Sequence, residues 1–526
     1  MKFLNIATVV GATSVAHLRE AADSLQLDMV FDKTVSHNNF NQTLFMFKGQ
    51  GDSFKTIDGQ NVYVIAPDAQ FNVEYTNRHE GVKEIIHAHG MIAGGYDGVP
   101  YISGLPLEYL DTQRYTYPVL EENRRSGEYW LHSHWHIVDG MTIPIIIEND
   151  KKYPSNFPKE VADNLNDAQE SQFFIEDFCP YLSDDGPGSN PTCCNEIVMK
   201  GLQEMYYGQK VKPTYPSFEE PATNENNCDV EHVDPADSGD VGFEALLVNG
   251  KDATAPQTVK VNSRFLRVRL TNAAAQSNFK ITFGGLPATL VAVDGQWVEP
   301  VDITKSGWWA AVAQRLTVLI DTKDMKDDTV FIARNEATGV DSMQGGVVVT
   351  KADAPATRSF SLIGEEVGYM TNENEKKLHA IQPLSVKEPD VEFRLNVTGD
   401  NGFQSLNGWQ WFPPNAMHDT PFVPNPNPMR VHYNDRVEIT IFNNNPDGHP
   451  IHLHQHTFQV VAVNGERLEN GALRDTIYVE GGCQSVTIAF DAVNPASTAL
   501  LHCHLGFHQE AGMFSTVQYV AEEKSL

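Results

Sequence analysis

The chain has 526 residues, which is more than one ordinary hydrophobic core can organise and predicts about three domains. Hydrophobic residues make up 41% of it, and 38 glycines and 29 prolines supply the many turns that all-β folds need. The 38 Lys and Arg residues face 69 Asp and Glu residues, and the resulting formal charge of −31 argues against nucleic acid and anionic membrane surfaces as partners.

The N-terminal segment 1–16 predicts a signal peptide. Lys2 precedes an apolar run over residues 3–10, and small residues end the segment before His17. This run is too short to span a bilayer, and no later apolar run is long enough to do so. We therefore expect a secreted, extracellular protein without a membrane span, and we expect a monomer.

One alternation of apolar and polar residues occurs three times along the chain, over residues 70–77, 264–272 and 436–443. Residues two apart in a strand point to the same face, so each segment predicts a half-buried β-strand that meets a loop at its final Asn. Because the three copies are widely separated, they indicate one β-sandwich architecture that is used three times.

Polar, proline-bearing stretches separate three predicted domains, at 17–150, 160–355 and 385–526. The middle domain carries an insertion over about 179–242 that is rich in Pro, Gly, Asp and Asn. In an exported chain the crowding of cysteines in this insertion predicts disulfides of unknown connectivity among Cys179, Cys193, Cys194 and Cys228. Glycosylation sequons at Asn41 and Asn396 agree with export.

Ten of the 19 histidines fall into four clusters, all in the first and third predicted domains. The clusters are His87-x-His89, His132-x-His134, His449-x-x-His452-x-His454, and His502-Cys503-His504 followed by His508 and Met513. Residues i and i+2 of a strand share a face, so each His-x-His can present two imidazoles to one place. Four such pairs together are strong evidence for metal sites.

Cys503 is predicted to belong to a different site from its neighbours. In an extended segment the Cys503 thiolate faces away from the imidazoles of His502 and His504, so this tripeptide can connect two metal sites. His449 has the opposite parity to His452 and is the natural second ligand beside Cys503.

The glycines that follow His504 allow the chain to turn back and bring His508 and Met513 to the same metal as Cys503. A thiolate with two histidines and a distant methionine is the ligand set of a blue-copper electron-transfer centre. Zinc is the competing metal, but one Cys with two His and a Met is not a usual zinc set.

Eight histidines remain, and imidazoles in this number could hold three coppers with coordination left open for O₂. The four motifs resemble the signature of the multicopper oxidases, the family of laccases, ascorbate oxidase, ferroxidases and bilirubin oxidase. The likeness covers essentially the whole mature chain, and the middle domain contributes residues 247–250, 293–295 and 314–315.

This resemblance implies an all-β fold of three cupredoxin-like Greek-key sandwich domains that hold four copper ions. It assigns the type 1 copper to His449, Cys503 and His508 with Met513 as axial ligand, and the type 2 copper to His87 and His452. It assigns one type 3 copper to His89, His132 and His504, and the other to His134, His454 and His502.

Several positions depart from the family pattern. Ala88 stands where a Trp is usual, Gln455 where a Gly is usual, and Gly506 and Gln509 where some relatives carry a carboxylate thought to relay protons. Because this acid is missing, the residues that carry protons to the O₂ site are not assigned by the resemblance.

Two acids are candidates for catalytic proton transfer. Asp97 matches a family Asp that assists O₂ reduction beside the type 2 copper. Glu510 is a substitute proton donor, and a plain surface position for this acid is at least as reasonable. We expect His456 to pack and hydrogen-bond near the cluster, and His136 to lie beside it or at the surface.

The resemblance implies that the chain is an enzyme. It would couple one-electron oxidation of a reducing substrate, which contacts His508, to reduction of O₂ to water. Phenols and aromatic amines are the expected substrates, as for a laccase. A metallo-oxidase of Fe(II) or Cu(I) is the alternative, although the 13 methionines form no Met-rich insert that would favour Cu(I). A copper-storage or electron-transfer protein without O₂ chemistry would not need eight additional histidines.

Overall fold

A computed structural model of the chain describes residues 22–520, with gaps at 38–39, 51–52, 67–69, 82, 94–95, 101, 119–124, 135–136, 138–139, 149–150, 179–242, 326–327, 337–342, 353–366, 401–402, 407–424, 426–427, 495–497 and 511. The predicted signal peptide, the insertion with its four cysteines, and His136 lie outside the described residues, as does the Asn41 side chain. None of the helices in these described ranges is long and apolar enough to cross a bilayer.

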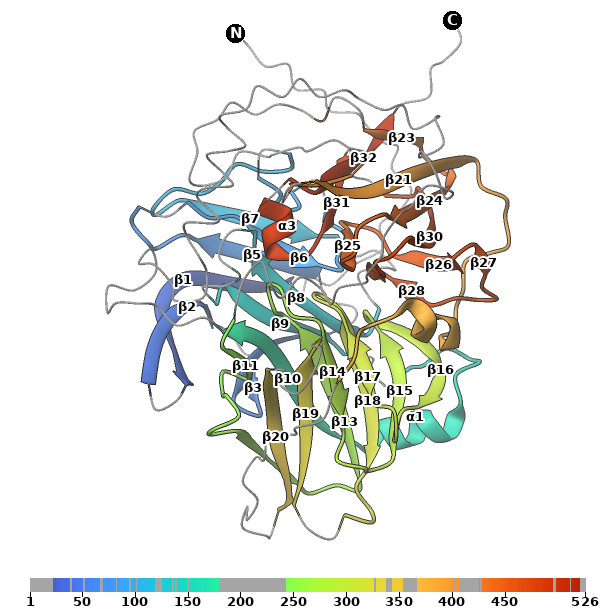
Figure 1. The fold of residues 1–526 in the computed structure, drawn as a ribbon. Helices are drawn as coiled ribbons and strands as arrows, with labels where there is room; N and C mark the ends of the chain where they lie inside the picture. The colour runs from blue at the N-terminus through green and yellow to red at the C-terminus, as the bar shows by residue number, and fades with distance from the viewer. Residues whose placement is uncertain are drawn as a thin grey trace, which may run out of the picture.

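The first domain consists of two sheets that enclose an aromatic-rich core (Figure 1). One sheet has the strand order β2 (Phe40–Gln50), β1 (Ala22–His37), β5 (Gln70–Thr76) and β7 (Thr112–Tyr117). The other has the order β3 (Phe54–Ile57), β4 (Gln60–Ile65), β9 (Thr142–Ile147), β8 (Gly127–Ser133) and β6 (Ile86–His89).

The middle domain follows the helix α1 (Lys159–Asn166) and repeats this two-sheet arrangement. Its larger sheet has the order β11 (Ala245–Val248), β10 (Gln169–Phe178), β13 (Phe265–Asn272), β18 (Arg315–Asp321), β15 (Ala288–Val293) and β16 (Gln296–Asp302). Its smaller sheet has the order β12 (Gln257–Val261), β20 (Gln344–Lys351), β19 (Thr329–Asn335), β14 (Phe279–Thr282) and β17 (Trp308–Ala310).

The third domain follows the 3-10 helix η2 (Asn372–Lys377) and includes the short helix α3 (Gly506–Glu510). One sheet has the order β22 (Phe403–Leu406), β21 (Val391–Asp400), β24 (Arg436–Asn443), β30 (Gln484–Asp491), β26 (Phe458–Val463) and β27 (Glu466–Arg467), and β28 (Leu473–Arg474) also pairs with β26. The other has the order β23 (Met429–His432), β32 (Phe514–Val520), β31 (Thr498–Cys503), β25 (His449–Leu453) and β29 (Thr476–Val479).

The three copies of the sequence pattern occupy the same place in the three domains. They form β5, β13 and β24, and each pairs in parallel with the first long strand of its domain and antiparallel with a later strand. This equivalence confirms the prediction of one sandwich architecture used three times.

The expectation of a half-buried strand is wrong for β13, in which every residue is buried. Its outward-facing Arg267 and Arg269 are only 5% and 4% exposed. Arg267 reaches the carbonyl of Leu165 in α1, and Arg269 reaches Glu128 in the first domain, so neighbouring elements cover the face that was expected to meet solvent.

The Asn at or just after the end of each repeated strand is fully buried: Asn77, Asn272 and Asn443. Each donates its side-chain amide to the backbone carbonyl of a later segment. Asn272 donates to the carbonyls of Ser277 and Ala310 at 3.0 and 2.9 Å, and Asn443 to those of Asp447 and Val479 at 2.7 and 3.0 Å. The repeated Asn therefore fastens the loop that leaves the strand.

Candidate metal centres

Eight buried histidines gather where strands of the first and third domains meet. Figure 1 shows β6, β25 and β31, which carry several of them, close to one another. The pairing of β6 with β8 sets His87 opposite His132, and the pairing of β25 with β31 sets His452 opposite His502. We call this the eight-histidine cluster, and it comprises His87, His89, His132, His134, His452, His454, His502 and His504.

The rings of this cluster interleave between the two domains. His89 stacks on His452 with ring centroids 3.7 Å apart, and His87 stacks on His454 at 3.9 Å. Three sets of three have possible ligand atoms within 4.8 Å of one another: His87, His89 and His452; His87, His134 and His454; and His89, His132 and His504. His502 joins through its Nε2 atom, 3.1 Å from Nε2 of His454. Neither domain alone supplies a complete set.

Hydrogen bonds fix which ring nitrogen faces the cluster. Three histidines donate from Nδ1 to backbone carbonyls at 2.8–2.9 Å: His87 to Asp97, His132 to Ser133 and His452 to Asp475. Their buried Nε2 atoms have no hydrogen-bond partner in the described part of the chain. Such oriented imidazoles with an unused lone pair fit a metal-ligand role.

The cluster also favours the neutral imidazole, which is the form that binds metals. Burial, and after it the neighbouring charged groups, holds the pKa well below the usual 6.5 for His89, His132, His134, His452, His454 and His504. Burial also lowers the pKa of His502, to about 3.

A second, smaller cluster lies on the opposite face of β31. The Sγ atom of Cys503 is 3.7 Å from Nδ1 of His449 and 3.6 Å from Nδ1 of His508. These two Nδ1 atoms are 3.0 Å apart, and all three side chains are buried. We call these residues the cysteine triad, and their position confirms that Cys503 and His449 face away from the eight-histidine cluster.

The turn after β31 places Met513 beside the cysteine triad. Helix α3 carries His508, and Gly512 then adopts φ 92°, a left-handed conformation that suits glycine. The Met513 amide donates to the carbonyl of His508, and the Cys503 amide donates to the carbonyl of Met513. The Met513 side chain is buried in the same apolar cluster as Cys503.

Comparisons with known proteins agree with this geometry. Three family models described as multicopper oxidase match residues 55–152, 220–352 and 389–523. The chain belongs to the multicopper oxidase family.

Individual relatives are similar over most of their length. The multicopper oxidase MmcO of Mycobacterium tuberculosis is 24% identical over 88% of this chain and 82% of its own. A laccase of Pycnoporus cinnabarinus is 24% identical over 81% of this chain and 77% of its own. The crystal structure of Fet3p, a multicopper oxidase that functions in iron import, matches with a TM-score of 0.69 and 18% identity over 95% of this chain and 90% of its own.

As a multicopper oxidase, the chain is a copper-dependent oxidoreductase that uses O₂. The eight-histidine cluster matches the trinuclear type 2 and type 3 site of the family, and the cysteine triad matches its type 1 site. The chain thus combines a site for one-electron transfer with a site for O₂.

Asp97 lies between two histidines of the trinuclear site. It is 1% exposed, and its carboxylate oxygens are 3.1 Å from Nδ1 of His87 and 2.8 Å from Nδ1 of His454. Burial raises the pKa of Asp97, and the contact with His87 opposes this rise. The Gln455 side chain also bonds to Asp97, and Gln455 adopts φ 59°, which explains why a glycine is usual at this position.

Two other residues were singled out from the sequence, His456 and Glu510, and the structure describes the side chain of His456 alone. His456 is buried, and its ring nitrogens contact the carbonyl of His454 and the Tyr519 hydroxyl, which confirms a packing role. The backbone of Glu510 lies in α3, but its side chain lies outside the described residues.

Sequence reasoning assigned no role at the trinuclear site to Asp475, Arg315 or Trp130, although it counted residues 314–315 in the family signature. Asp475 is 3.0 Å from Nε2 of His89, and the fully buried Arg315 of the middle domain pairs with Asp475 through both guanidinium Nη atoms. Trp130 packs on His132 with ring centroids 4.3 Å apart. A sequence signal for Asp475 was present, because the charged dipeptide 474–475 stands inside an otherwise apolar run.

Proposed function

We propose that this multicopper oxidase takes single electrons from phenols and aromatic amines, as a laccase does, and uses them to reduce O₂ to water. The observation that carries the proposal is the position of Cys503 in the cysteine triad while its chain neighbours His502 and His504 lie in the eight-histidine cluster. One tripeptide therefore joins a site that can meet a reductant to a site that can hold O₂.

We also propose how the residues share four coppers. His449, Cys503 and His508 would hold the type 1 ion with Met513 as axial ligand, and His87 and His452 would hold the type 2 ion. One type 3 ion would be held by His89, His132 and His504, and the other by His134, His454 and His502. The first type 3 set is supported by the proximity of its three ligand atoms, and the second by the His454–His502 contact.

Copper bound at these sites would supply the redox chemistry, since it can accept single electrons at a cysteine site and reduce O₂ at an imidazole site. The chain supplies the connection, because the peptide bonds from Cys503 to His502 and to His504 form a short covalent path. It also supplies rigidity, since backbone carbonyls orient the imidazole rings and the buried position excludes bulk water.

We propose Asp97 as the residue that holds a proton beside the O₂ site. Its carboxylate contacts the rings of His87 and His454, and its raised pKa lets it keep a proton at a higher pH than an exposed Asp does. Glu510 is a second candidate for this proton donor, because it follows His508 by two residues in the sequence.

The needs of the two classes of reductant favour an organic one. The cysteine triad lies in apolar surroundings, since Leu505, Met513 and Ile451 are buried in one cluster with Cys503. A phenol needs an apolar cleft and one group to accept its proton, whereas Fe(II) needs several oxygen ligands.

The alternative substrate is Fe(II). The net charge of −31 attracts cations, and a similar solved structure belongs to an oxidase that functions in iron import. Iron oxidation would use the same copper sites and differ only in the groups that hold the reductant.

Steady-state O₂ uptake with a dimethoxyphenol, a phenylenediamine and Fe(II), compared by kcat/KM at one pH, separates the two substrates. We expect higher values for the organic reductants. The Cys503→Ser variant gives the rate of uncatalysed iron oxidation to be subtracted. A preference for Fe(II) of a hundredfold, about 2.7 kcal/mol in transition-state terms, would contradict the laccase-like proposal.

A further inference from the structure

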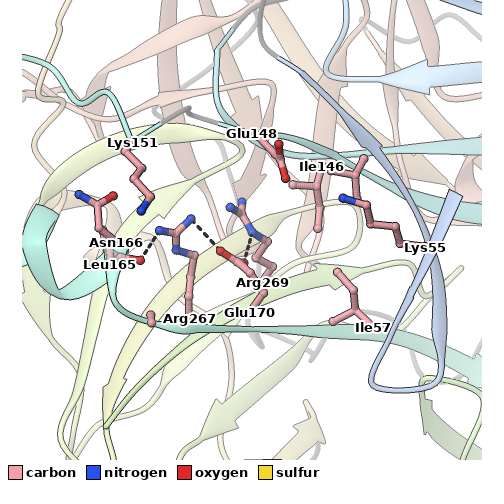
Figure 2. A pocket seen from close by; sticks show the side chains of 12 residues that line it. Lys55, Ile57, Ile146, Glu148, Lys151, Leu165, Asn166, Glu170, Arg267 and Arg269 are labelled. Atoms are coloured by element: carbon pink, nitrogen blue, oxygen red, sulfur yellow. Dashed lines mark hydrogen bonds and ion pairs between the residues drawn. The ribbon is translucent and has the colours of Figure 1, made fainter. Parts of the chain in front are cut away.

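A pocket of about 450 Å³ lies between the first and middle domains, and no histidine is among the described residues that line it (Figure 2). Its walls come from β3, β4 and the end of β9 on one side, and from α1, β10 and β13 on the other. Pockets of this size bind small organic molecules in many proteins. Neither copper cluster includes any of its residues.

The floor of the pocket is a set of paired charges, in which Arg267 and Arg269 are buried and Glu170 is partly exposed. Glu170 joins two arginines, with Arg267 Nη1 2.9 Å from its Oε1 and Arg269 Nε 2.8 Å from its Oε2. Arg269 also contacts Glu128 at 2.8 Å. Two carboxylates therefore balance two guanidinium groups, and the floor is close to neutral.

The rim of the pocket adds positive charge. Lys55 and Lys151 are exposed at its edge, and among the described residues of the rim that line it Glu148 is the one acid. Figure 2 shows the Lys151 side chain extending toward the guanidinium of Arg267. In a chain with a net charge of −31, this excess of cations at one opening is an exception, and it favours an anion.

One nitrogen atom of the floor, Nε of Arg267, makes no hydrogen bond within the described part of the chain. The bonds of Arg267 use its Nη atoms, which donate to Glu170, to the Tyr153 hydroxyl and to the Leu165 carbonyl. Its buried Nε has no hydrogen-bond partner in the described part of the chain. A buried donor without a partner costs free energy, and an acceptor that reached this atom would offset the cost.

Apart from Asn166, the other residues that line the pocket are apolar and come from both domains: Ile57, Val64, Ile146, Leu165 and Ala168. A bare inorganic anion would leave these side chains unused. A ligand that matches the whole lining needs an apolar body to meet them and an acidic group to meet the cations.

We propose that this pocket binds a small organic acid, with its carboxylate near Lys151 and Arg267 and its apolar body against Ile57, Val64 and Ile146. The site is separate from the copper clusters, so binding here does not depend on the proposed oxidase substrate. Because both domains line the pocket, the bound acid would hold the first and middle domains together.

Isothermal titration calorimetry of the copper-loaded protein with 4-methylbenzoate tests this site without an activity readout. We expect wild-type protein to bind the acid and the Lys55→Ala/Lys151→Ala variant to bind it roughly tenfold more weakly, since the Lys151 contact and both positive charges of the rim are lost. The matched control is Lys305→Ala/Lys323→Ala, which removes the same charge from exposed positions of the middle domain outside the pocket and should leave Kd unchanged.

The neutral analogue 4-methylbenzamide and inorganic phosphate complete the test. Neither should compete with the acid, because the amide lacks the charge and phosphate lacks the apolar body. No binding by wild-type protein, equal Kd in the two double variants, or equal competition by either probe would overturn the proposal. A change in the copper electron paramagnetic resonance spectrum that follows the titration would place the acid on copper and would also overturn it.

Discussion

Cys503 and its two neighbours divide their side chains between the two faces of β31. The register Ile451↔Cys503 and His452↔His502 places the thiolate on the side of His449 and the imidazoles on the side of the first domain. At the scale of single residues, the alternation of a strand is thus what separates the two copper sites.

The substitution Cys503→Ser tests this separation. Serine keeps the size and the strand but lacks the thiolate, so we expect the blue colour and the oxidase activity to disappear while about three coppers per chain remain. Visible absorption, O₂ uptake and metal analysis measure the three quantities. Survival of the blue band, or loss of all copper, would show that the two sites are assigned wrongly.

The ligand residues could be predicted because their spacing is local. Because side chains alternate between the two faces of a strand, the spacing alone places His87 and His89 on one face, and His502 and Cys503 on opposite faces. Asp475 and Arg315 could not be found in this way, since their contacts join residues 160 apart in the chain and depend on how the domains meet. The role of Trp130 was missed because a buried tryptophan is more often simple core.

At the scale of elements, the repeated strands β5, β13 and β24 were predictable in place and type, whereas their burial was not. Apolar alternation indicates that one face of a strand is buried, but it does not indicate whether another element also covers the polar face. The polar face of β13 is covered by Glu128 and α1, so Arg267 and Arg269 are paired inside the protein. The terminal Asn of each strand was predicted to mark a loop and is found to fasten it.

The substitution Asn272→Ala tests this fastening. It leaves the buried carbonyls of Ser277 and Ala310 without a donor, and each unsatisfied group costs about 1–3 kcal/mol. We expect a lower Tm by calorimetry. Asn262→Ala, at an exposed position just before β13, is the control and should change Tm little. Equal Tm values for the two variants would contradict the role of the repeated Asn.

At the scale of the whole molecule, a buried charge network joins all three domains. Arg315 of the middle domain pairs with Asp475 of the third, and Asp475 contacts His89 of the first. Arg474 extends the network to Glu375 and Asp294. Residues with such contacts specify how the domains dock as well as how the trinuclear site is oriented.

Removal of the Arg315 charge should therefore affect both docking and copper. Arg315→Met leaves the buried Asp475 unpaired, and breaking a buried pair in this way costs about 3–5 kcal/mol. We expect a lower Tm and fewer trinuclear coppers, measured by calorimetry and metal analysis. The control Arg264→Met breaks an exposed pair with Asp321 and should change neither quantity. An effect no larger than that of the control would exclude the network from this role.

The trinuclear site is shared between the two ends of the polypeptide, and its metal content therefore reports on the completion of the fold. His89 and Asp475, which touch across the site, are 386 positions apart in the chain. The histidines of the first domain must wait, during synthesis, until the last sandwich has formed and docked on them. Copper arriving earlier would find only the four imidazoles of the first domain, so we expect full copper loading to distinguish assembled molecules from incomplete ones.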